Sequence, residues 1–498
     1  MAFPDKQQFL ERATQGNLVP VYREIMADQD TPVSAYERLR TGLKAEAENT
    51  HTFLLESVEG GENMARYSFL GGNPQVIIEA TGRTVTIREP AGEDRVFEDV
   101  EPLSVVKEFM SRYQAVPDEN LPRFFGGVIG YIGYDAVAQF DKVPLCEKPG
   151  FGWPDILLIL TDTLVIFDHV KHTTKLVANA FIEDDAEAAY ADALNRIAQL
   201  AERLNADVPR RTLDVHADIP ELPLRSNMEH DVFTGAVEKA KEYIRAGDII
   251  QVVLSQRFEV DGAEDPLNVY RALRAINPSP YMFCLEFGDF RIAGSSPEVN
   301  VRGEDGRVKI RPIAGTRPRG ADEAGDRALE EDLLADPKER AEHVMLVDLA
   351  RNDIGRVCKW GTVTPTDFMI IERYSHVMHI VSNVTGELAD DKDTYDLLRA
   401  TFPAGTLSGA PKIRAMEIIA ELETARRGAY GGAIGYFGFD GNHDSCIVIR
   451  TVVMDGDKSY VQAGAGIVAD SDPEMEYQET RNKARGMLKA IALARNFE

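Results

Sequence analysis

Apolar residues along the chain follow two different patterns, which alternate from one end to the other. The segments 155–169 and 446–456 are short runs rich in Ile, Leu and Val, as in strands buried inside a sheet. The segments 336–353 and 470–496 place apolar residues at helical spacing, and 184–203 is Ala-rich with Asp near its start. The alternation predicts an α+β fold, in which mixed α/β layers contain large, mainly antiparallel sheets flanked by helices.

The segment 204–227 has no sustained period and is rich in Pro and Asp, which predicts a linker. A chain of 498 residues is also long enough to need more than one core. We therefore expect an N-terminal domain over residues 1–225 and a C-terminal domain over residues 226–498.

The two sides of the linker share a motif. Residues 124–136 read FFGGVIGYIGYDA, and residues 429–441 read AYGGAIGYFGFDG. Chance similarity between two Gly-rich strands is one explanation. The common order of the matched positions favours a duplication that produced two structurally related halves.

The composition argues against several classes of protein. The 82 acidic residues outnumber the 55 basic ones, for a net charge of −27, so we expect no nucleic-acid partner. No apolar run of about 18 residues occurs, which argues against a membrane span. The N-terminus lacks the basic and then apolar layout of a secretory signal. The four Cys residues form no CxxC pair, which is typical of thiols in a reducing compartment, here the cytoplasm.

The segment RPIAGTRPRG, residues 311–320, concentrates Arg and Pro around a Gly-Thr pair. A solvated loop is the ordinary explanation of such a run. The alternative is an oxyanion site, because Gly315 lets a ligand approach the backbone and the Thr316 hydroxyl can hold a carboxylate. In a chain with a large negative charge, the arginines of this segment could supply the positive charge that an anionic substrate needs.

The predicted helix over 336–353 carries a carboxylate on its apolar face. Asp336 can cap this helix, and Glu339 can complete a capping box. Glu342 then lies on the face that should pack inward, where a carboxylate is costly unless it is paired or bound to a metal. An internal salt bridge is the alternative to a metal.

The predicted helix over 470–496 presents Glu476 and Glu479 one turn apart on one face. Such pairs are usually only solvated. The small residues Gly464–Gly466 just before this helix, however, would let a ligand approach backbone amides. Two helices that each present a carboxylate inward suit Mg²⁺, which takes few protein oxygens.

Three further residues could take part in chemistry. Arg450 interrupts the apolar segment 446–456 and needs an anionic partner, either a protein carboxylate or a substrate. The comparable segment 155–169 has no Arg, so anion chemistry would belong to the second half alone. His379 alternates with apolar neighbours on a predicted strand, where a core role is more usual. Glu298 follows a Gly-Ser-Ser-Pro stretch that predicts a tight turn, and a protonated carboxyl there could act as a general acid.

Many motifs together make the chain resemble a known family. From about Asp231 to the C-terminus, the chain resembles the chorismate-utilising enzymes in IRAGDIIQVVLSQRF, GSSPE, PIAGTRPRG, EHVMLVDLARND, VMHIVS, FPAGTLSGAPK, YGGAIGY, CIVIR and GAGIV…PEMEYQET. The first half is similar to the N-terminal domain of the anthranilate-forming members, through VPVYRE and LLESVEGGENMARYSFLG. The resemblance covers nearly the whole chain and implies an enzyme that acts on chorismate.

The resemblance also implies roles for individual residues. Chorismate is a dianion, so an oxyanion site would have a purpose. Glu298 would protonate the departing C4 hydroxyl, His379 would assist the later loss of pyruvate, and Thr406 would help to hold the substrate. The implied substrate contacts are Gly315, Thr316, Tyr430, Arg450, Gly464, Ala465 and Gly466. The implied Mg²⁺ ligands are Glu342 and Glu479, with Glu476 close by.

Two positions distinguish the reactions within this family. Isochorismate and salicylate synthases carry a water-activating Lys where this chain has Gln251, and Gln is not a base at neutral pH. Aminodeoxychorismate synthases typically carry an attacking Lys where this chain has Ala314. Ammonia would then attack C2 directly, and loss of pyruvate would give anthranilate, as in the first step of tryptophan biosynthesis. Aminodeoxychorismate, in the folate pathway, is the alternative product.

The resemblance implies partners and regulation as well. No Cys lies in a Gly-x-Cys-x-Gly turn, so ammonia would come from a separate glutamine amidotransferase subunit, in a heterotetramer of two large and two small subunits. Ser57, Pro280, Tyr281 and Met282 lie in segments that resemble a feedback site for L-tryptophan. An ordinary strand end and a Pro-rich turn would explain the same residues. A catalytically inactive, tryptophan-sensing subunit is the non-enzymatic alternative.

Overall fold

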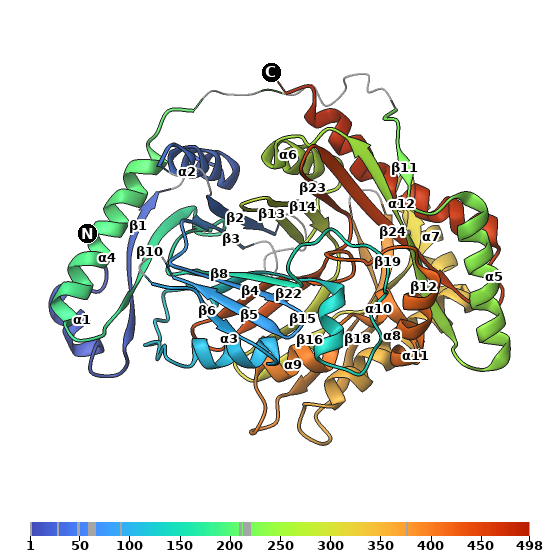
Figure 1. Cartoon of the computed structure of the whole chain (residues 1–498), viewed down its shortest axis with the longest axis horizontal. Helices are drawn as coiled ribbons and strands as arrows, with labels where there is room; N and C mark the ends of the chain where they lie inside the picture. Colours follow the sequence, from blue (N-terminus) through green and yellow to red (C-terminus); the bar gives the residue numbers. More distant parts are fainter. Residues whose placement is uncertain are drawn as a thin grey trace.

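Two large sheets and the helices around them make up the protein (Figure 1). The structure is a computed structural model, and it describes residues 2–26, 29–46, 50–57, 66–89, 92–208, 212, 221–374 and 377–497. Every strand pair in the described ranges is antiparallel, so the predicted mainly antiparallel α+β fold is confirmed. Residues 209–211 and 213–220 of the linker predicted over 204–227 lie outside these ranges.

Sheet A takes strands from both halves of the sequence. Its order is β1 (Leu18–Met26), β10 (Thr173–Phe181), β9 (Thr163–Asp168), β3 (Tyr67–Gly72), β2 (His51–Glu56), β13 (Tyr281–Phe287), β14 (Phe290–Ser296), β23 (Thr451–Asp455), β24 (Lys458–Ile467), β12 (Gln251–Asp261) and β11 (Arg225–Ser226). The short strand β20 (Gly409–Ala410) also pairs with β12. The two halves meet where β2 pairs with β13.

Sheet B has a similar construction. Its order is β17 (Ile313–Pro318), β19 (Val377–Glu387), β16 (Arg307–Ile310), β15 (Val299–Glu304), β22 (His443–Ile447), β21 (Ala433–Gly438), β7 (Gly127–Ile132), β8 (Ile156–Thr161), β4 (Val76–Thr81), β5 (Thr84–Arg88) and β6 (Arg95–Phe97). The strand β18 (Thr364–Arg373) pairs with β19 at the edge of the sheet. Here the halves meet where β7 pairs with β21.

The strand order is the same on either side of the middle of each sheet. In sheet A, the path from β1 to β2 repeats as the path from β12 to β13, and in sheet B the path from β4 to β7 repeats as that from β15 to β21. The repeated motif forms β7 and β21, and Gly130 lies opposite Gly435, which holds the same place in the other copy. The topology therefore has an approximate two-fold axis, in agreement with the predicted duplication.

The helices cover the outer faces and the ends of the sheets. In Figure 1, α4 and α12 lie on opposite sides of the molecule, as the two-fold relation requires. The helices are α1 (Lys6–Arg12), α2 (Pro32–Glu46), α3 (Pro102–Met110), the 3₁₀ turn η1 (Tyr134–Gln139), α4 (Ala186–Leu204), α5 (His230–Ala246), α6 (Pro266–Ile276), α7 (Glu323–Ala335), α8 (Pro337–Gly355), α9 (Thr394–Thr401), α10 (Gly405–Ser408), α11 (Lys412–Leu422) and α12 (Pro473–Ala494). No helix in the described ranges is long and apolar enough to cross a membrane.

The three helices predicted from apolar spacing are present as α4, α8 and α12. Asp336 caps α8 by accepting hydrogen bonds from Lys338 and Glu339 backbone N–H groups at 2.9 and 3.3 Å. The predicted capping box is wrong, because the Glu339 carboxylate turns to Arg317 at 3.3 Å instead. The ion pair with Arg317 thus replaces the hydrogen bond that Glu339 would accept from the Asp336 backbone N–H in a capping box.

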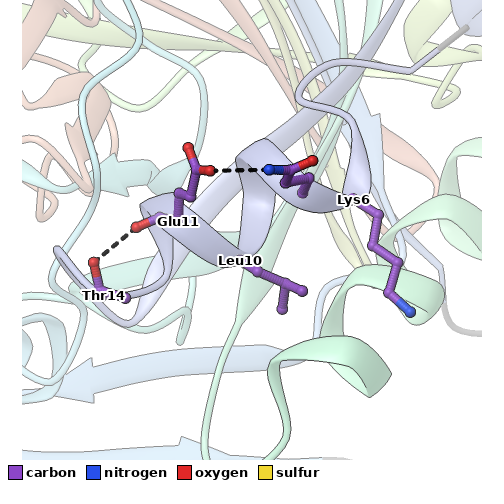
Figure 2. A pocket seen from close by; sticks show the side chains of 5 residues that line it. Lys6, Leu10, Glu11 and Thr14 are labelled. Atoms are coloured by element: carbon purple, nitrogen blue, oxygen red, sulfur yellow. Dashed lines mark hydrogen bonds between the residues drawn. The ribbon is translucent and has the colours of Figure 1, made fainter.

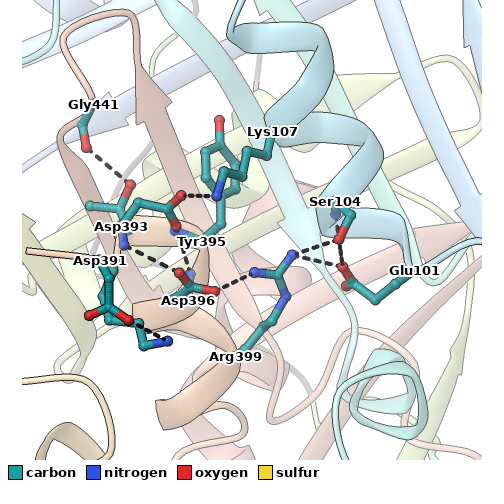
Figure 3. Close-up of polar contacts among 11 residues, drawn as sticks. Glu101, Ser104, Lys107, Asp391, Asp393, Tyr395, Asp396, Arg399 and Gly441 are labelled. Atoms are coloured by element: carbon teal, nitrogen blue, oxygen red, sulfur yellow. Dashed lines mark hydrogen bonds and ion pairs between the residues drawn. The ribbon is translucent and has the colours of Figure 1, made fainter. Parts of the chain in front are cut away.

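Ion pairs add a further connection between the halves. Arg399 of α9 donates to Glu101 at the start of α3 at 2.7 Å, and Lys107 of α3 pairs with Asp393 at 2.6 Å (Figure 3). These contacts join helices on either side of the boundary near residue 225. The boundary therefore divides the sequence, whereas both sheets run through it.

Close packing at the centre of sheet B gives a prediction. A Cβ on Gly130 would lie 2.0 Å from the Leu157 carbonyl oxygen, so Gly130→Ala must push two strands apart. We expect the free energy of unfolding, measured in urea, to fall by roughly 3 kcal/mol, the upper end for overpacking. Gly235→Ala in α5 is the control, because its Cβ meets nothing within 4 Å, and helix propensity should make it neutral or stabilising. Equal unfolding midpoints for the two variants would contradict the prediction.

Candidate active site

Two corners carry the chain from sheet B to sheet A. The segment predicted as one strand over 155–169 is β8 and β9, separated by Asp162. The segment 446–456 likewise contains the end of β22 and all of β23, with Arg450 just before β23. The expectation that Arg450 lies within a strand is therefore wrong, because the chain leaves sheet B after Ile447. Its φ of +52°, uncommon for Arg, sets the direction of its side chain at the corner.

The Arg450 side chain is half-buried beside Tyr430. Burial lowers its pKa, and the nearby Tyr430 opposes this effect. In the part of the chain that the structure describes, Arg450 has neither an ion-pair partner nor a side-chain hydrogen bond. A desolvated cation without a counter-ion is costly, so this corner suits an anionic ligand.

His379 is held in one tautomer by its neighbours across the sheet. It lies on β19 opposite Thr316 of β17, as the predicted strand requires. Its Nδ1 lies 3.0 Å from the Gly315 carbonyl oxygen, which can only accept, so Nδ1 carries the proton. Burial lowers the pKa of the ring, which keeps it neutral. Nε2 is therefore left with a free lone pair that can take a proton.

Gly315 is a position where glycine is needed. Its φ is +67°, and a Cβ there would lie 3.1 to 3.3 Å from side chains on α7, α8 and β19. The arginines of the segment 311–320 do not surround it as expected. They are neutralised within the protein, because α7, α8 and β18 carry carboxylates beside them. Their ion pairs are Arg311–Glu372, Arg317–Asp332, Arg317–Asp336 and Arg319–Asp326.

The glycines of β24 make room for two side chains. A Cβ on Gly464 would lie 2.7 Å from the Tyr430 hydroxyl, and one on Gly466 would lie 2.6 Å from the Gln251 amide nitrogen. The strand β23 pairs with β24 only up to Val461, so this stretch of β24 has no strand partner on that side. Backbone groups next to Tyr430 are thus available to a ligand.

The three predicted carboxylate ligands lie near one another on α8 and α12. Burial raises the pKa of Glu342, and the charges of Glu339 and Glu479 raise it further. Burial also raises the pKa of Glu476, again with a contribution from Glu479. Lys483 pairs with Glu479 at 2.7 Å and offsets only part of this negative charge.

The donor set of these helices fits a hard cation with few protein ligands. Among the described residues, no group of three or more His, Cys, Asp and Glu side chains is placed to enclose a metal ion. Mg²⁺ does not need such a cage, since it binds one or two carboxylates and keeps waters or substrate oxygens. The mutually repelling carboxylates of α8 and α12 therefore fit Mg²⁺.

Glu298 lies between β14 and β15 and lines a narrow cavity that Thr406 and Leu349 also line. The stretch before it, predicted as a tight turn, is the end of β14. Burial raises the pKa of the Glu298 carboxyl to about 7, against the opposing effects of the Thr406 hydroxyl and the Lys483 charge. A carboxyl with this pKa keeps its proton for much of the time at neutral pH, as a general acid must.

The two-fold relation identifies a residue that sequence reasoning did not single out. Arg196 of α4 and Lys483 of α12 stand at the same position relative to the N-caps of their helices. Each donates to a carbonyl of the strand that its helix covers, Arg196 to Asn179 at 2.9 Å and Lys483 to Gly464 at 3.1 Å. The shared motif does not include these two residues, so their equivalence becomes visible only when the two helices are compared in space.

The equivalent corners differ in charge. In the first half, Arg196 donates to the corner carboxylate Asp162 at 2.8 Å, so a protein anion occupies this place. In the second half the corner carries Arg450, and Lys483 has no carboxylate from the corner beside it. The charges leave room for an external anion at the Arg450 corner but not at the Asp162 corner. This is what we expect if anion chemistry belongs to the second half alone.

The residues predicted as an effector site meet at the junction of the halves. Glu56 of β2 lies opposite Met282 of β13, and Ser57 is the next residue along. The Ser57 hydroxyl is buried and has no hydrogen-bond partner in the described residues. Tyr281, next to Pro280, lies opposite Ser296 at the end of β14. Ser296 is two residues before Glu298 in the sequence. The junction is thus one strand away from the candidate general acid.

A separate hollow lies on the surface at α1 (Figure 2). In Figure 1, α1 is on the opposite side of the view from α8 and α12. Its lining residues are Lys6, Gln7, Leu10, Glu11 and Thr14. Gln7 and Thr14 donate to the Glu11 side chain and carbonyl, so the hollow contains only ordinary contacts of one short helix.

Two antiparallel sheets, each shared by both halves of the chain, define the class of fold to which the protein belongs. The family model for "chorismate binding enzyme" matches residues 50–489. The chain belongs to this family.

Individual relatives resemble the chain over nearly its whole length. It is 49% identical over 496 residues to anthranilate synthase component 1 of Acetivibrio thermocellus, with 99% of each chain covered. It is 49% identical over 495 residues to the protein of the same name from Pseudomonas aeruginosa, with 98% of this chain and 99% of the relative covered.

Solved structures give the same result for the fold. Anthranilate synthase component I from Streptococcus pneumoniae has a TM-score of 0.75 and 39% identity, covering 85% of this chain and 92% of that one. The menaquinone-specific isochorismate synthase of Escherichia coli has a TM-score of 0.70, covering 97% and 98%, but only 20% identity. The second likeness concerns the fold alone.

Proposed function

We propose that the chain is the aminating subunit of an anthranilate synthase. It would join ammonia to C2 of chorismate and eliminate pyruvate to give anthranilate. The observation that carries the proposal is the near-complete match, at 49% identity, to curated anthranilate synthases. The geometry adds a physical basis, because Arg450 is a half-buried, desolvated cation that lacks a counter-ion in the described part of the chain.

Substrate binding would use both charge and backbone. Arg450 would take one carboxylate of chorismate in a two-point contact, and the Thr316 hydroxyl would donate to substrate oxygens. Tyr430 and the Gly464–Gly466 backbone, with Ala465 between the glycines, would form the wall opposite. Glu342 and Glu479, with Glu476, would hold Mg²⁺, which when bound neutralises carboxylate charge and polarises the ring.

The chemistry assigned to the protein consists of two proton transfers. Glu298 would give its proton to the C4 hydroxyl, which leaves as water while ammonia bonds to C2. The Nε2 lone pair of His379 would then take the proton from C2 as the enolpyruvyl C–O bond breaks and pyruvate departs. Thr406, beside Glu298, would keep the substrate against the acid.

Two buried side chains favour ammonia as the direct nucleophile. Gln251 lies against Gly466 in the site, and its amide cannot activate water. Ala314 lies in β17 beside Gly315 and offers no amine. An enzyme with this site would need free ammonia, so we propose a separate glutamine amidotransferase subunit as its source, in a heterotetramer with two copies of each chain.

We also propose that L-tryptophan binds at the junction of β2 and β13. The orphaned Ser57 hydroxyl is a donor that a ligand could satisfy, and Pro280 is followed by Tyr281 and Met282 at the start of the facing strand β13. Tryptophan can inhibit only if it binds a less active arrangement of the halves better than the active one. The strand β14 offers a direct connection, since it pairs with β13 and leads to Glu298.

The experiment that tests the function uses the purified chain with chorismate, Mg²⁺ and an ammonium salt. We expect anthranilate fluorescence to appear with ammonium and not with glutamine, because the chain carries no glutaminase nucleophile. Chromatography of the product separates anthranilate from aminodeoxychorismate. Absence of chorismate turnover would favour an inactive sensing subunit. Glutamine-driven turnover in a preparation free of contaminating amidotransferase would contradict the proposal that ammonia comes from a separate subunit.

The metal assignment predicts the effect of neutral replacements. Glu342→Gln or Glu479→Gln should lower turnover on the order of 100-fold or more, because each removes a charged oxygen from a hard cation. Glu476→Gln should have a smaller effect. The control is Glu474→Gln on the same helix, whose carboxylate bonds His230 on the surface and should leave turnover unchanged. Near-normal rates for Glu342→Gln at ordinary Mg²⁺ would show that this residue is not a ligand.

The raised pKa of Glu298 predicts a pH dependence. The carboxyl is protonated below about pH 7 and loses its proton above it, so the acid is present at low pH and lost as the pH rises. At constant free ammonia, kcat should therefore fall above about pH 7. Glu298→Gln should remove this descending limb together with most of the activity. A parent profile that stays flat to pH 9 under the same conditions would exclude Glu298 as the acid.

The effector assignment predicts a separation of regulation from catalysis. Ser57→Arg and Met282→Thr should each weaken tryptophan inhibition by roughly tenfold or more while uninhibited turnover changes little, because neither residue belongs to the substrate motifs. Thr14→Arg, at the exposed end of α1, is the charge-matched control. Anthranilate formation across a tryptophan titration, with calorimetric binding, is the measurement. Parent-like inhibition in both variants would place the effector elsewhere.

A further inference from the structure

A buried ion pair stands directly behind the proposed substrate site. Arg427 and Glu423 lie in the segment between α11 and β21, and their side chains are only 1% and 3% exposed. The Arg427 Nε and Nη2 atoms donate to the two oxygens of Glu423 at 2.9 and 2.6 Å. Neither side chain is open to solvent, so neither is a surface group that happens to find a partner.

The remaining hydrogen bonds of Arg427 fix two backbone segments. Its Nη1 donates to the Leu407 carbonyl at 2.6 Å, and Nη2 donates to the Val253 carbonyl at 2.7 Å. Leu407 follows Thr406 in α10, and Val253 lies opposite Gly466 in sheet A. One planar group therefore sets the distance between two elements that are assigned to hold the substrate.

The flat face of the same guanidinium contacts two aromatic rings. Its Cζ lies 4.5 Å from the centre of the Tyr134 ring and 5.5 Å from that of Tyr430. Tyr134 comes from the first half of the chain, and Tyr430 faces Gly464 so closely that a methyl group there would clash with its hydroxyl. A change in Arg427 would thus move the ring that forms one wall of the site.

Glu423 is itself anchored to sheet A, through β12. The Ser255 N–H and hydroxyl donate to it at 2.9 and 2.8 Å, and Gln462 donates to the Ser255 hydroxyl at 2.8 Å. Fully satisfied buried networks of this kind hold one geometry. The position of Arg427 is therefore determined from both ends.

We propose that Arg427 is a positioning residue for turnover. It holds Thr406, Tyr430 and the β12–β24 pairing at Gly466 in the arrangement that binds chorismate, and it does not touch the substrate. This inference rests on the proposed function. A lysine would keep the charge beside Glu423 but has no planar fork, so it cannot reach both carbonyls at once.

Arg427→Lys is the first test. We expect it to fold with a thermal midpoint close to the parent, while kcat/KM for chorismate falls roughly ten- to a hundred-fold, with KM raised and kcat lowered, because small misplacements of substrate contacts are costly. The control is Arg196→Lys, which removes a forked Arg that pairs with Asp162 in the first half and should keep parent kinetics.

Pyruvate release from chorismate, with ammonium and Mg²⁺ present, is the readout for all variants. It does not depend on which aromatic product forms, so an error in the assigned product leaves the comparison intact. A parent protein that releases no pyruvate would contradict the proposed function. Parent kinetics in folded Arg427→Lys would overturn the positioning role instead.

A paired apolar replacement decides the outcome if the lysine variant does not fold. Apolar substitution of both partners of a buried ion pair is often neutral for stability, so Arg427→Met with Glu423→Leu should fold. We expect this double variant to lose at least roughly tenfold in kcat/KM despite its stability. Parent kinetics would overturn the proposal. So would failure of both variants to fold beside a folded Arg196→Lys, which would make Arg427 a folding residue only.

Discussion

The pairing of the two halves at the centre of each sheet is the constraint on which the other features depend. The strands β7 and β21 approach so closely that a Cβ on Gly127 of β7 would lie 2.1 Å from the Phe437 carbonyl oxygen of β21. Together with the β2–β13 pair, this contact makes both sheets continuous through both halves. Continuous sheets fix where the chain must cross from one sheet to the other, and the crossing corners become rigid places for charged groups.

The positive charge of the covering helix is balanced differently at the two equivalent corners. A cation from the covering helix faces each corner, Arg196 in the first half and Lys483 in the second. In the first half, Asp162 supplies the opposite charge from within, and the corner is complete. In the second half Arg450 adds a further desolvated cation, and the described residues give it no carboxylate. In a chain with a net charge of −27, this corner therefore concentrates local positive charge.

The proposed effector junction and the proposed general acid lie one strand apart in sheet A. The junction at Ser57 and Met282 and the acid candidate Glu298 belong to neighbouring strands, so a ligand that alters the β2–β13 contact acts on the site through one hydrogen-bonded ladder. On the opposite side, Arg427 connects Tyr134 of the first half to Tyr430 of the second. Both connections are short because the halves share their sheets.

Apolar periodicity predicted the helices α8 and α12, Ala-rich composition predicted α4, and a repeated Gly-rich motif predicted the strands β7 and β21, because each of these depends on residues close in sequence. The runs of Ile, Leu and Val predicted antiparallel sheets but not the order of their strands. The resemblance of the motifs likewise named the residues of the candidate site. The partners and the burial of the charged residues could not be predicted from neighbouring positions in the sequence. The arginines of 311–320 are paired within the protein, Arg450 stands at a corner, and Arg196 and Lys483 are equivalent, since ion pairs and burial depend on which distant segments the folded sheets bring together.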